Sequence, residues 1–122
     1  MELRTYEEAP INMTGSGNQV KWLVDRDEGS NVFEIREISI PPHGKSSYGT
    51  HAHEHGVFVL SGKGRLVGRT SSIQLLPKSS VYVSPNEEHQ WVNDSASEPL
   101  VFICVIPTGS EDDVKKLLNI RK

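Results

Sequence analysis

Histidine is the residue type whose spacing in this chain most clearly suggests chemistry. His51, His53 and His55 occupy alternate positions directly before an apolar run at residues 57–60. Residues two apart on a β-strand project from the same face, so His51 and His53 can direct their imidazoles toward one point. Imidazole is a common ligand for transition metals, and the stretch therefore predicts a metal site.

A second cluster supplies a fourth histidine. His89 is followed at the same spacing by Trp91 and Asn93, so these three residues share one strand face. Four of the five histidines therefore lie in two short clusters. The fifth, His43, lies in a Pro-Pro-His-Gly turn and is interpreted as a surface residue, whereas Trp91 is either a wall of the site or an ordinary core residue.

The elements that must position these residues are short strands separated by turns. Turn signals rich in Gly, Pro and Ser recur through the middle of the chain. They separate strands predicted at residues 20–24, 32–40, 57–60, 65–67, 73–76, 81–83, 90–92 and 100–106. Strands of this size at this spacing predict a β-sandwich or β-barrel. The apolar phase shifts between Ile35 and Ile38, which indicates a bulge or a strand buried on both faces.

The two ends differ from the middle. Residues 1–19 are predicted to form an arm, loosely ordered or laid over the body of the fold or over a partner subunit, because Pro and Gly break any periodicity. Residues 20–107 form the predicted barrel, and residues 108–122 a short helix and tail of the same single domain. Ser110 and Asp113 make a capping pattern for this helix. Its apolar stripe is predicted at Val114, Leu117 and Leu118.

The two histidine clusters resemble the paired motifs of the cupins, which are small double-stranded β-barrels. Pro85, His89 and Asn93 match the second motif in spacing, and Gly62 matches the glycine that ends the first. The resemblance covers residues 41–107. It implies an all-β fold, a double-stranded β-helix of the jelly-roll type, to which the pattern above adds a short C-terminal helix. It also implies one metal ion inside the barrel, as in small single-domain, oxalate-decarboxylase-like cupins.

Two departures from the cupin pattern affect the expected ligands. The position seven residues before Gly62, usually a carboxylate, is His55, and the spacer between His53 and this position is one residue instead of three or four. Some small cupins use histidine at this position. The resemblance therefore implies four metal ligands: His51, His53, His55 and His89.

The shortened spacer restricts the geometry of such a site. On a straight strand, residues 51 and 55 would lie about 14 Å apart, whereas an imidazole nitrogen binds a metal at about 2.0 to 2.1 Å. A sharp bend between His53 and Gly56 is therefore required, and Gly56 would permit it by adopting φ > 0. Glu54 is the alternative ligand, because it would replace His55 if the turn were displaced.

The expected ligands also limit the function. Neutral imidazoles leave a divalent ion with close to its full positive charge, so the site should attract a small anionic molecule. The ligand types suit manganese, iron, zinc or nickel without distinguishing among them. The first hypothesis is a metal-dependent enzyme that acts on a small carboxylate or oxo acid, resembling the decarboxylase and dioxygenase cupins. The alternative is a non-catalytic binding or sensor cupin, because Glu54 is the only acid or base that the first motif offers. A metal-free sugar-binding or isomerase cupin would leave the clustered histidines without a role.

Composition limits the partners. The chain has 122 residues, a net charge of −3 and a pI near 5.9, and its basic residues are scattered, so a nucleic acid partner is not expected. No apolar run approaches the roughly 20 residues of a membrane-spanning helix. The first residues lack a signal-peptide layout, and the lone Cys104 cannot form an intrachain disulfide. We therefore expect a cytoplasmic protein with no membrane partner. We also expect a homodimer, because a small barrel has sheet edges and outer faces to cover.

Overall fold

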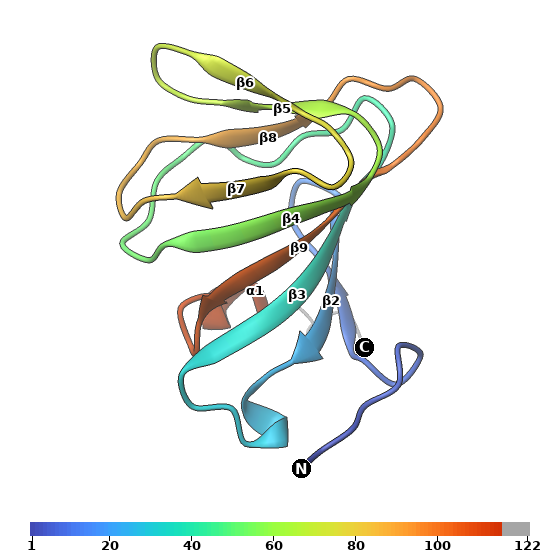
Figure 1. Ribbon diagram of the computed structural model, residues 1–122, viewed down its shortest axis with the longest axis vertical. Coiled ribbons are helices and arrows are strands. Elements are labelled where there is room, and N and C mark those ends of the chain that lie inside the picture. Colours follow the sequence, from blue (N-terminus) through green and yellow to red (C-terminus); the bar gives the residue numbers. More distant parts are fainter. Residues whose placement is uncertain (116–122) are drawn as a thin grey trace.

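The structure is a computed structural model that describes residues 1–115 (Figure 1). Within this range, nine strands form two antiparallel sheets, so the predicted all-β fold is confirmed. The larger sheet has the order β1-β2-β3-β9-β4-β7, and the smaller has the order β6-β5-β8. In Figure 1 the smaller sheet lies at the top, and the strands of the larger sheet follow below it.

The strands that were predicted agree with the observed bounds to within two residues. Their ranges are β2 (Gln19–Val24), β3 (Phe33–Ile40), β4 (His55–Ser61), β5 (Gly64–Val67), β6 (Ser72–Leu75), β7 (Ser80–Val83), β8 (Gln90–Asn93) and β9 (Leu100–Pro107). One further strand and two short helical segments complete the described part of the chain: β1 (Ile11–Met13), the 3-10 helix η1 (Arg26–Glu28) and α1 (Asp112–Lys115).

An apolar core joins the two sheets. Trp91 of β8 stacks on Phe102 of β9 with the ring centroids 4.6 Å apart, which packs the smaller sheet against the larger. Trp22, Val59 and Leu100 are completely buried in the same cluster. Full burial of a large apolar side chain contributes about 1.5 to 3 kcal/mol. Trp91 is therefore a core residue, and its place at the wall of the site is described below.

Asn93 fixes the loops at one end of the barrel. Its side-chain amide is buried and donates to the backbone carbonyls of Ile40, Pro41 and Glu98 at 2.9 to 3.0 Å. Its carbonyl oxygen accepts from the backbone N–H of Ser95 at 2.9 Å. One side chain therefore holds together the ends of β3 and β8 and the loop before β9.

Strand β3 carries two charged side chains on its inward face. Glu34 and Arg36 are both buried, and Arg36 lies opposite Cys104 of β9. The bulge considered between Ile35 and Ile38 is not in β3, which pairs with β9 without a register shift; the irregular strand is the neighbouring β2, between Trp22 and Val24. The inward face of β3 therefore combines apolar core residues with a buried acid and a buried base.

The N-terminal arm lies on the body of its own chain. β1 pairs with β2 in antiparallel register. The indole N–H of Trp22 donates to Oδ1 of the buried Asn12 at 2.7 Å. The arm is therefore a further strand of the larger sheet, followed by a loop that returns toward the barrel interior.

The C-terminal segment contains the predicted helix, but α1 begins at Asp112, and the hydroxyl of Ser110, the predicted cap, donates instead to the carbonyl of Pro107 at 2.6 Å. Val114 of α1 packs against the core, and its carbonyl accepts from the Asn12 side chain at 3.1 Å. Leu117 and Leu118, which were predicted to continue the apolar stripe, lie outside the described residues. Among residues 1–115, no helix has the length and apolar character needed to cross a bilayer.

Candidate metal centre

The histidine-bearing loop bends before β4 begins. Residues 51–54 are not part of a strand, and β4 starts at His55. The required bend was expected between His53 and Gly56, and the role given to Gly56 is wrong, because Gly56 pairs with Tyr82 and Val105 inside β4 and its φ is not positive. The change of direction at Ala52 and His53 brings the histidines together instead.

Backbone contacts place the loop beside the second histidine cluster. Gly49 and His89 form an isolated antiparallel bridge with both N–H to carbonyl bonds made, at 2.9 and 3.2 Å. The N–H of Asn86 also donates to the carbonyl of His51 at 2.8 Å. The two sequence motifs therefore meet through the main chain, which fixes the distance between their side chains.

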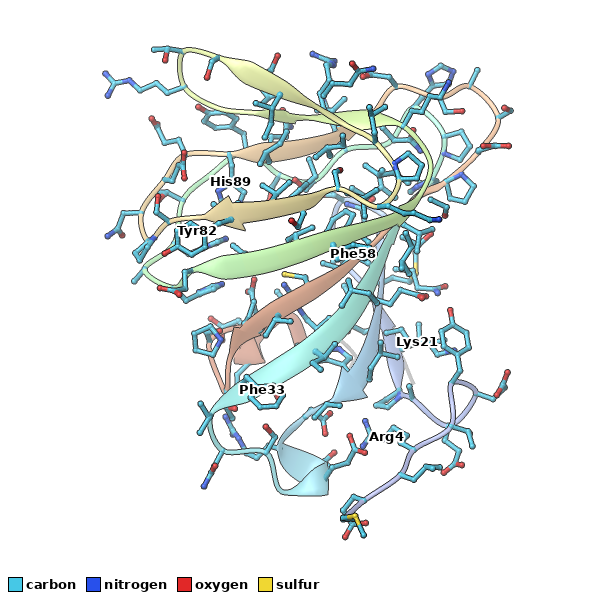
Figure 2. The ribbon with its side chains drawn as sticks, in the orientation of Figure 1. Arg4, Lys21, Phe33, Phe58, Tyr82 and His89 are labelled. Atoms are coloured by element: carbon cyan, nitrogen blue, oxygen red, sulfur yellow. The ribbon has the colours of Figure 1, made fainter. Side chains whose placement is uncertain are left out.

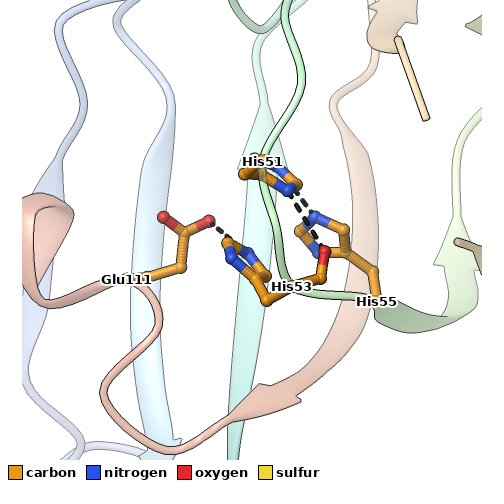
Figure 3. A group of neighbouring side chains, drawn as sticks. All are labelled: His51, His53, His55 and Glu111. Atoms are coloured by element: carbon orange, nitrogen blue, oxygen red, sulfur yellow. Dashed lines mark hydrogen bonds and ion pairs between the residues drawn. The ribbon is translucent and has the colours of Figure 1, made fainter. Parts of the chain in front are cut away.

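All four predicted histidines come together. His51 and His55 have their Nε2 atoms 3.0 Å apart. The ring of His89 lies 4.8 Å from that of His51 and 5.3 Å from that of His55, measured between centroids. The ring of His53 lies 4.0 Å from that of His51 (Figure 3).

Three of the rings have their Nδ1 atoms occupied by protein partners. Nδ1 of His51 lies 3.3 Å from the carbonyl oxygen of His53, and Nδ1 of His89 lies 2.7 Å from that of Glu87. A carbonyl can only accept, so these Nδ1 atoms carry the proton in the neutral rings and the Nε2 atoms carry lone pairs. Nδ1 of His55 lies 3.1 Å from Sγ of Cys104, to which it can donate in the same way. Partners of this kind commonly orient histidines that bind a metal through Nε2.

His53 differs from the other three. Its ring is stacked on that of His51 with an angle of 8° between the planes. Imidazole lone pairs lie in the ring plane, so two parallel stacked rings cannot both direct them at one ion. Binding by both His51 and His53 would therefore require one ring to rotate.

Glu111 adds a carboxylate to the cluster. Its Oε1 atom lies 3.4 Å from Nε2 of His53 (Figure 3). Four residues each offer one ligand atom here: His51, His53, His55 and Glu111. These four atoms all lie within 4.8 Å of one another, an arrangement that could hold a metal ion. Glu54 lies elsewhere: it is exposed and close to Tyr82, whose pKa it helps to raise after the larger effect of removal from water.

Burial keeps two of the imidazoles neutral. Removal from water lowers the pKa of His55 to about 2, and the nearby His51 and Arg36 add to the effect. Burial also lowers the pKa of His53, against the opposing effect of Glu111. Both rings are therefore uncharged at neutral pH, which is the form that binds metal ions.

The centre opens into a cavity of about 490 Å³. Its polar wall includes His51, His55 and His89 together with Arg36 and Glu111. Its apolar wall is formed by side chains of the core, including Ile38, Ile40, Trp91 and Phe102, and the loop at residues 14–18 covers part of it. A small molecule in this cavity would meet the histidines, one cation and an apolar surface at the same time.

Three polar residues of the site were not predicted. Arg36 and Cys104 lie at inward positions of strands that were predicted, and the alternation of Arg36 with Ile38 and Ile40 in the sequence is a signal that could have placed it inside. Glu111 has no such signal, because it enters the cavity from the turn after β9.

Comparison with known proteins identifies the family. The Cupin_2 family model, described as a cupin domain, matches residues 36–106, which is more than half of the chain. The chain belongs to the cupin family. This result confirms the cupin resemblance of the two histidine clusters.

One curated enzyme and two solved structures show how far the similarity to individual proteins extends. A curated enzyme from Rhodospirillum rubrum, 1-methylthio-D-xylulose 5-phosphate methylsulfurylase, is 35% identical over 74 residues, which are 60% of this cupin and 46% of that protein. This cupin therefore matches about half the length of that relative. A cupin 2 domain-containing protein from Halorhodospira halophila is 30% identical, with a TM-score of 0.71 over 84% of this chain and 77% of that one. A predicted oxalate decarboxylase from Thermotoga maritima has a TM-score of 0.72 at 17% identity, over 88% of this chain and 99% of that one, and this similarity concerns the fold alone.

Proposed function

We propose that this cupin is a metal-dependent enzyme that holds one divalent ion and acts on a small carboxylate or oxo acid. The observation that carries the proposal is the convergence of His51 and His55 at 3.0 Å between Nε2 atoms. Two nitrogens that bind one ion at about 2.1 Å and at right angles to each other lie about 3.0 Å apart. The two rings are therefore already at the separation that a shared ion requires.

We propose His51, His55 and His89 as the principal ligands. Each has Nε2 available when Nδ1 donates to its protein partner. The fourth predicted ligand, His53, joins them if its stacked ring rotates; otherwise that position is available to water or substrate. The neutral ligands leave the positive charge of the ion uncompensated, which favours an anionic oxygen ligand.

The surrounding residues suit catalysis in an enclosed site. A bound divalent ion would polarise a carbonyl or carboxylate group of the substrate. The apolar wall near Trp91 and Phe102 would exclude water from the reacting group. Glu111 provides a proton acceptor or donor inside the cavity, where Glu54 of the first motif does not lie, and it is directly beside His53.

The similarity to an enzyme favours catalysis over binding alone. The Rhodospirillum rubrum relative is named for a reaction on a phosphorylated sugar. In this cupin, an anionic substrate would agree with both the neutral ligand set and the presence of Arg36 in the cavity.

The test begins with the metal content of protein purified without chelator and without a nickel affinity column. We expect about one ion per chain, removable by chelation, and turnover of small oxo acids that disappears and returns with the ion. His51→Ala, His55→Ala and His89→Ala should abolish stoichiometric binding. His53→Ala should weaken binding by about 10- to 100-fold, as the loss of a supporting partner does.

Two controls make the result specific. His43→Ala removes an exposed histidine and should leave metal binding unchanged. Glu54→Ala should also have no effect, because this carboxylate lies on the outer surface with Tyr82. Metal binding that survives His51→Ala but is lost in Glu54→Ala would disprove the ligand set, and ligand binding without turnover would favour the sensor function.

A further inference from the structure

Arg36 is a cation buried in the wall of the cavity. Its residue is only 3% exposed, and its side chain reaches the cavity from the inward face of β3. The central carbon of the guanidinium lies 5.6 Å from the centroid of the Trp22 ring, so the indole covers one face of the guanidinium. Such a position is costly for a charge unless an acceptor of opposite charge is present.

The partners of Arg36 leave much of its hydrogen-bonding capacity unused. A guanidinium has five N–H donors. One terminal nitrogen donates to Sγ of Cys104 at 3.3 Å, and sulfur is a weak acceptor. The other lies 3.8 Å from Oε1 of Glu111, which is too far for a hydrogen bond. Nε is buried without any hydrogen-bond partner.

Glu111 is held loosely although its backbone is anchored. Its carboxylate lies between Arg36 and His53, at contact distances of 3.8 and 3.4 Å. The chain on either side of it is fixed, since the N–H of Gly109 donates to Oε1 of the buried Glu34 at 3.0 Å and Asn12 binds the carbonyl of α1. The side chain of Glu111 can therefore turn away from Arg36 without moving the segment that carries it.

We propose that Arg36 forms an oxyanion subsite beside the metal centre, and that Glu111 occupies this subsite until a carboxylate or phosphate group of the substrate displaces it. The inference deepens the proposed function, on which it rests, by assigning the substrate a second anionic group. One group would face the histidines and the other would bind Arg36, while Glu111 remains next to His53.

The geometry explains why a second oxyanion fits. Arginine presents paired N–H groups that match carboxylate and phosphate oxygens in a bidentate way. Arg36 and His55 are both within hydrogen-bond distance of the same Cys104 sulfur, so the cation and the metal centre are neighbours. A molecule only a few bonds long could therefore reach both.

The test measures the binding of malonate and of inorganic phosphate by calorimetry, using the metal-free protein so that the ion itself cannot bind the probe. Arg36→Gln should weaken the binding of the preferred probe by at least about tenfold, the loss expected for hydrogen bonds to a charged group. Glu111→Gln should strengthen it several-fold, because the competing charge is removed. The probe that binds wild-type protein more tightly identifies the substrate group as a carboxylate or a phosphate.

Arg65→Gln is the matched control. Arg65 also pairs with a carboxylate, that of Asp94, but on the exposed surface, so probe binding should not change. A folded Arg36→Gln protein that binds the probe as well as wild type would overturn the proposal. If Arg36→Gln does not fold, Glu111→Gln decides, and unchanged or weaker binding in that variant would also overturn it.

The two proposals fail in different ways. Protein that binds anions through Arg36 but holds no metal would refute the proposed function and leave the subsite in place. Protein that binds a metal through the histidines, with anion affinity independent of Arg36, would refute the subsite alone.

Discussion

The buried His55 makes the stability of the metal-free protein depend on pH. In the unfolded chain this histidine has an ordinary pKa of about 6.5, whereas burial lowers the pKa of His55 to about 2 in the folded protein. Between these values the unfolded state binds a proton that the folded state does not. The contribution to stability is therefore complete above pH 6.5 and decreases as the pH falls.

The magnitude follows from proton linkage. Each pH unit below 6.5 lowers the free energy of unfolding by about 1.4 kcal/mol for one such histidine, so the loss between pH 7 and pH 5 is roughly 2 kcal/mol. Urea unfolding of metal-free protein at both pH values measures it. His55→Gln keeps a polar side chain of similar size but cannot take up the proton, so the difference between the two pH values should be smaller by this amount.

Comparison of the two proteins isolates His55 from other titrating groups. His53, whose pKa is also lowered by burial, is present in both and contributes equally. A His55→Gln protein with the same loss of stability as wild type between pH 7 and pH 5 would refute the reasoning. It would mean that His55 takes up its proton in the folded state and is not held in the neutral form that a metal ligand requires.

Three further predictions concern the fold, the assembly and the arm. Asn93→Ala should lower the free energy of unfolding by roughly 2 to 4 kcal/mol, because the buried side-chain amide and its bonds to three backbone carbonyls are lost. Thermal or urea unfolding would show the change, and a loss below about 0.5 kcal/mol would contradict it. We propose a homodimer through the outer face of the larger sheet, where Phe33, Phe58 and Tyr82 are exposed (Figure 2), and Phe58→Glu should convert it to the monomer in light scattering. A wild-type mass of 13.6 kDa at every concentration would exclude the dimer. Asn12→Ala should destabilise the protein by roughly 1 to 3 kcal/mol, because Trp22 Nε1 loses its acceptor in the core, and an unchanged urea midpoint would argue against that role.

The positions of the strands were predictable because turn residues and apolar runs alternate along the middle of the chain. The convergence of the histidines was also predictable, since His51 and His89 belong to two motifs with known spacing. The site of the bend was not, because a glycine permits a turn without requiring one, and Gly56 is instead used as an ordinary position of β4. Here the cross-strand pairing of β4 with β7 and β9 determined the local conformation.

The chemistry around the histidines was predictable only where it follows strand periodicity. Arg36 shares the inward phase of Ile38 and Ile40, but a buried charge is normally unfavourable. The shift of the apolar phase between Ile35 and Ile38 predicts only a bulge or a strand buried on both faces, and neither alternative singles out Arg36. Glu111 approaches His53 from 58 positions further along the chain, through a turn whose path depends on contacts with Glu34 and Asn12. Such a placement depends on tertiary contacts that no local pattern records.

Different segments of the chain supply the histidines and the rest of the cavity wall, and this affects how the barrel could change its ligand. The histidines come from the middle of the chain, whereas the loop at residues 14–18 and Glu111 come from segments that flank the barrel. Substitutions in these flanking segments could reshape the space above the histidines without disturbing the β4 and β8 contacts that hold them. The histidine cluster can thus stay constant while this part of the wall varies, and libraries randomised only in residues 14–17 should yield variants with new ligand preferences and an unchanged affinity for the ion.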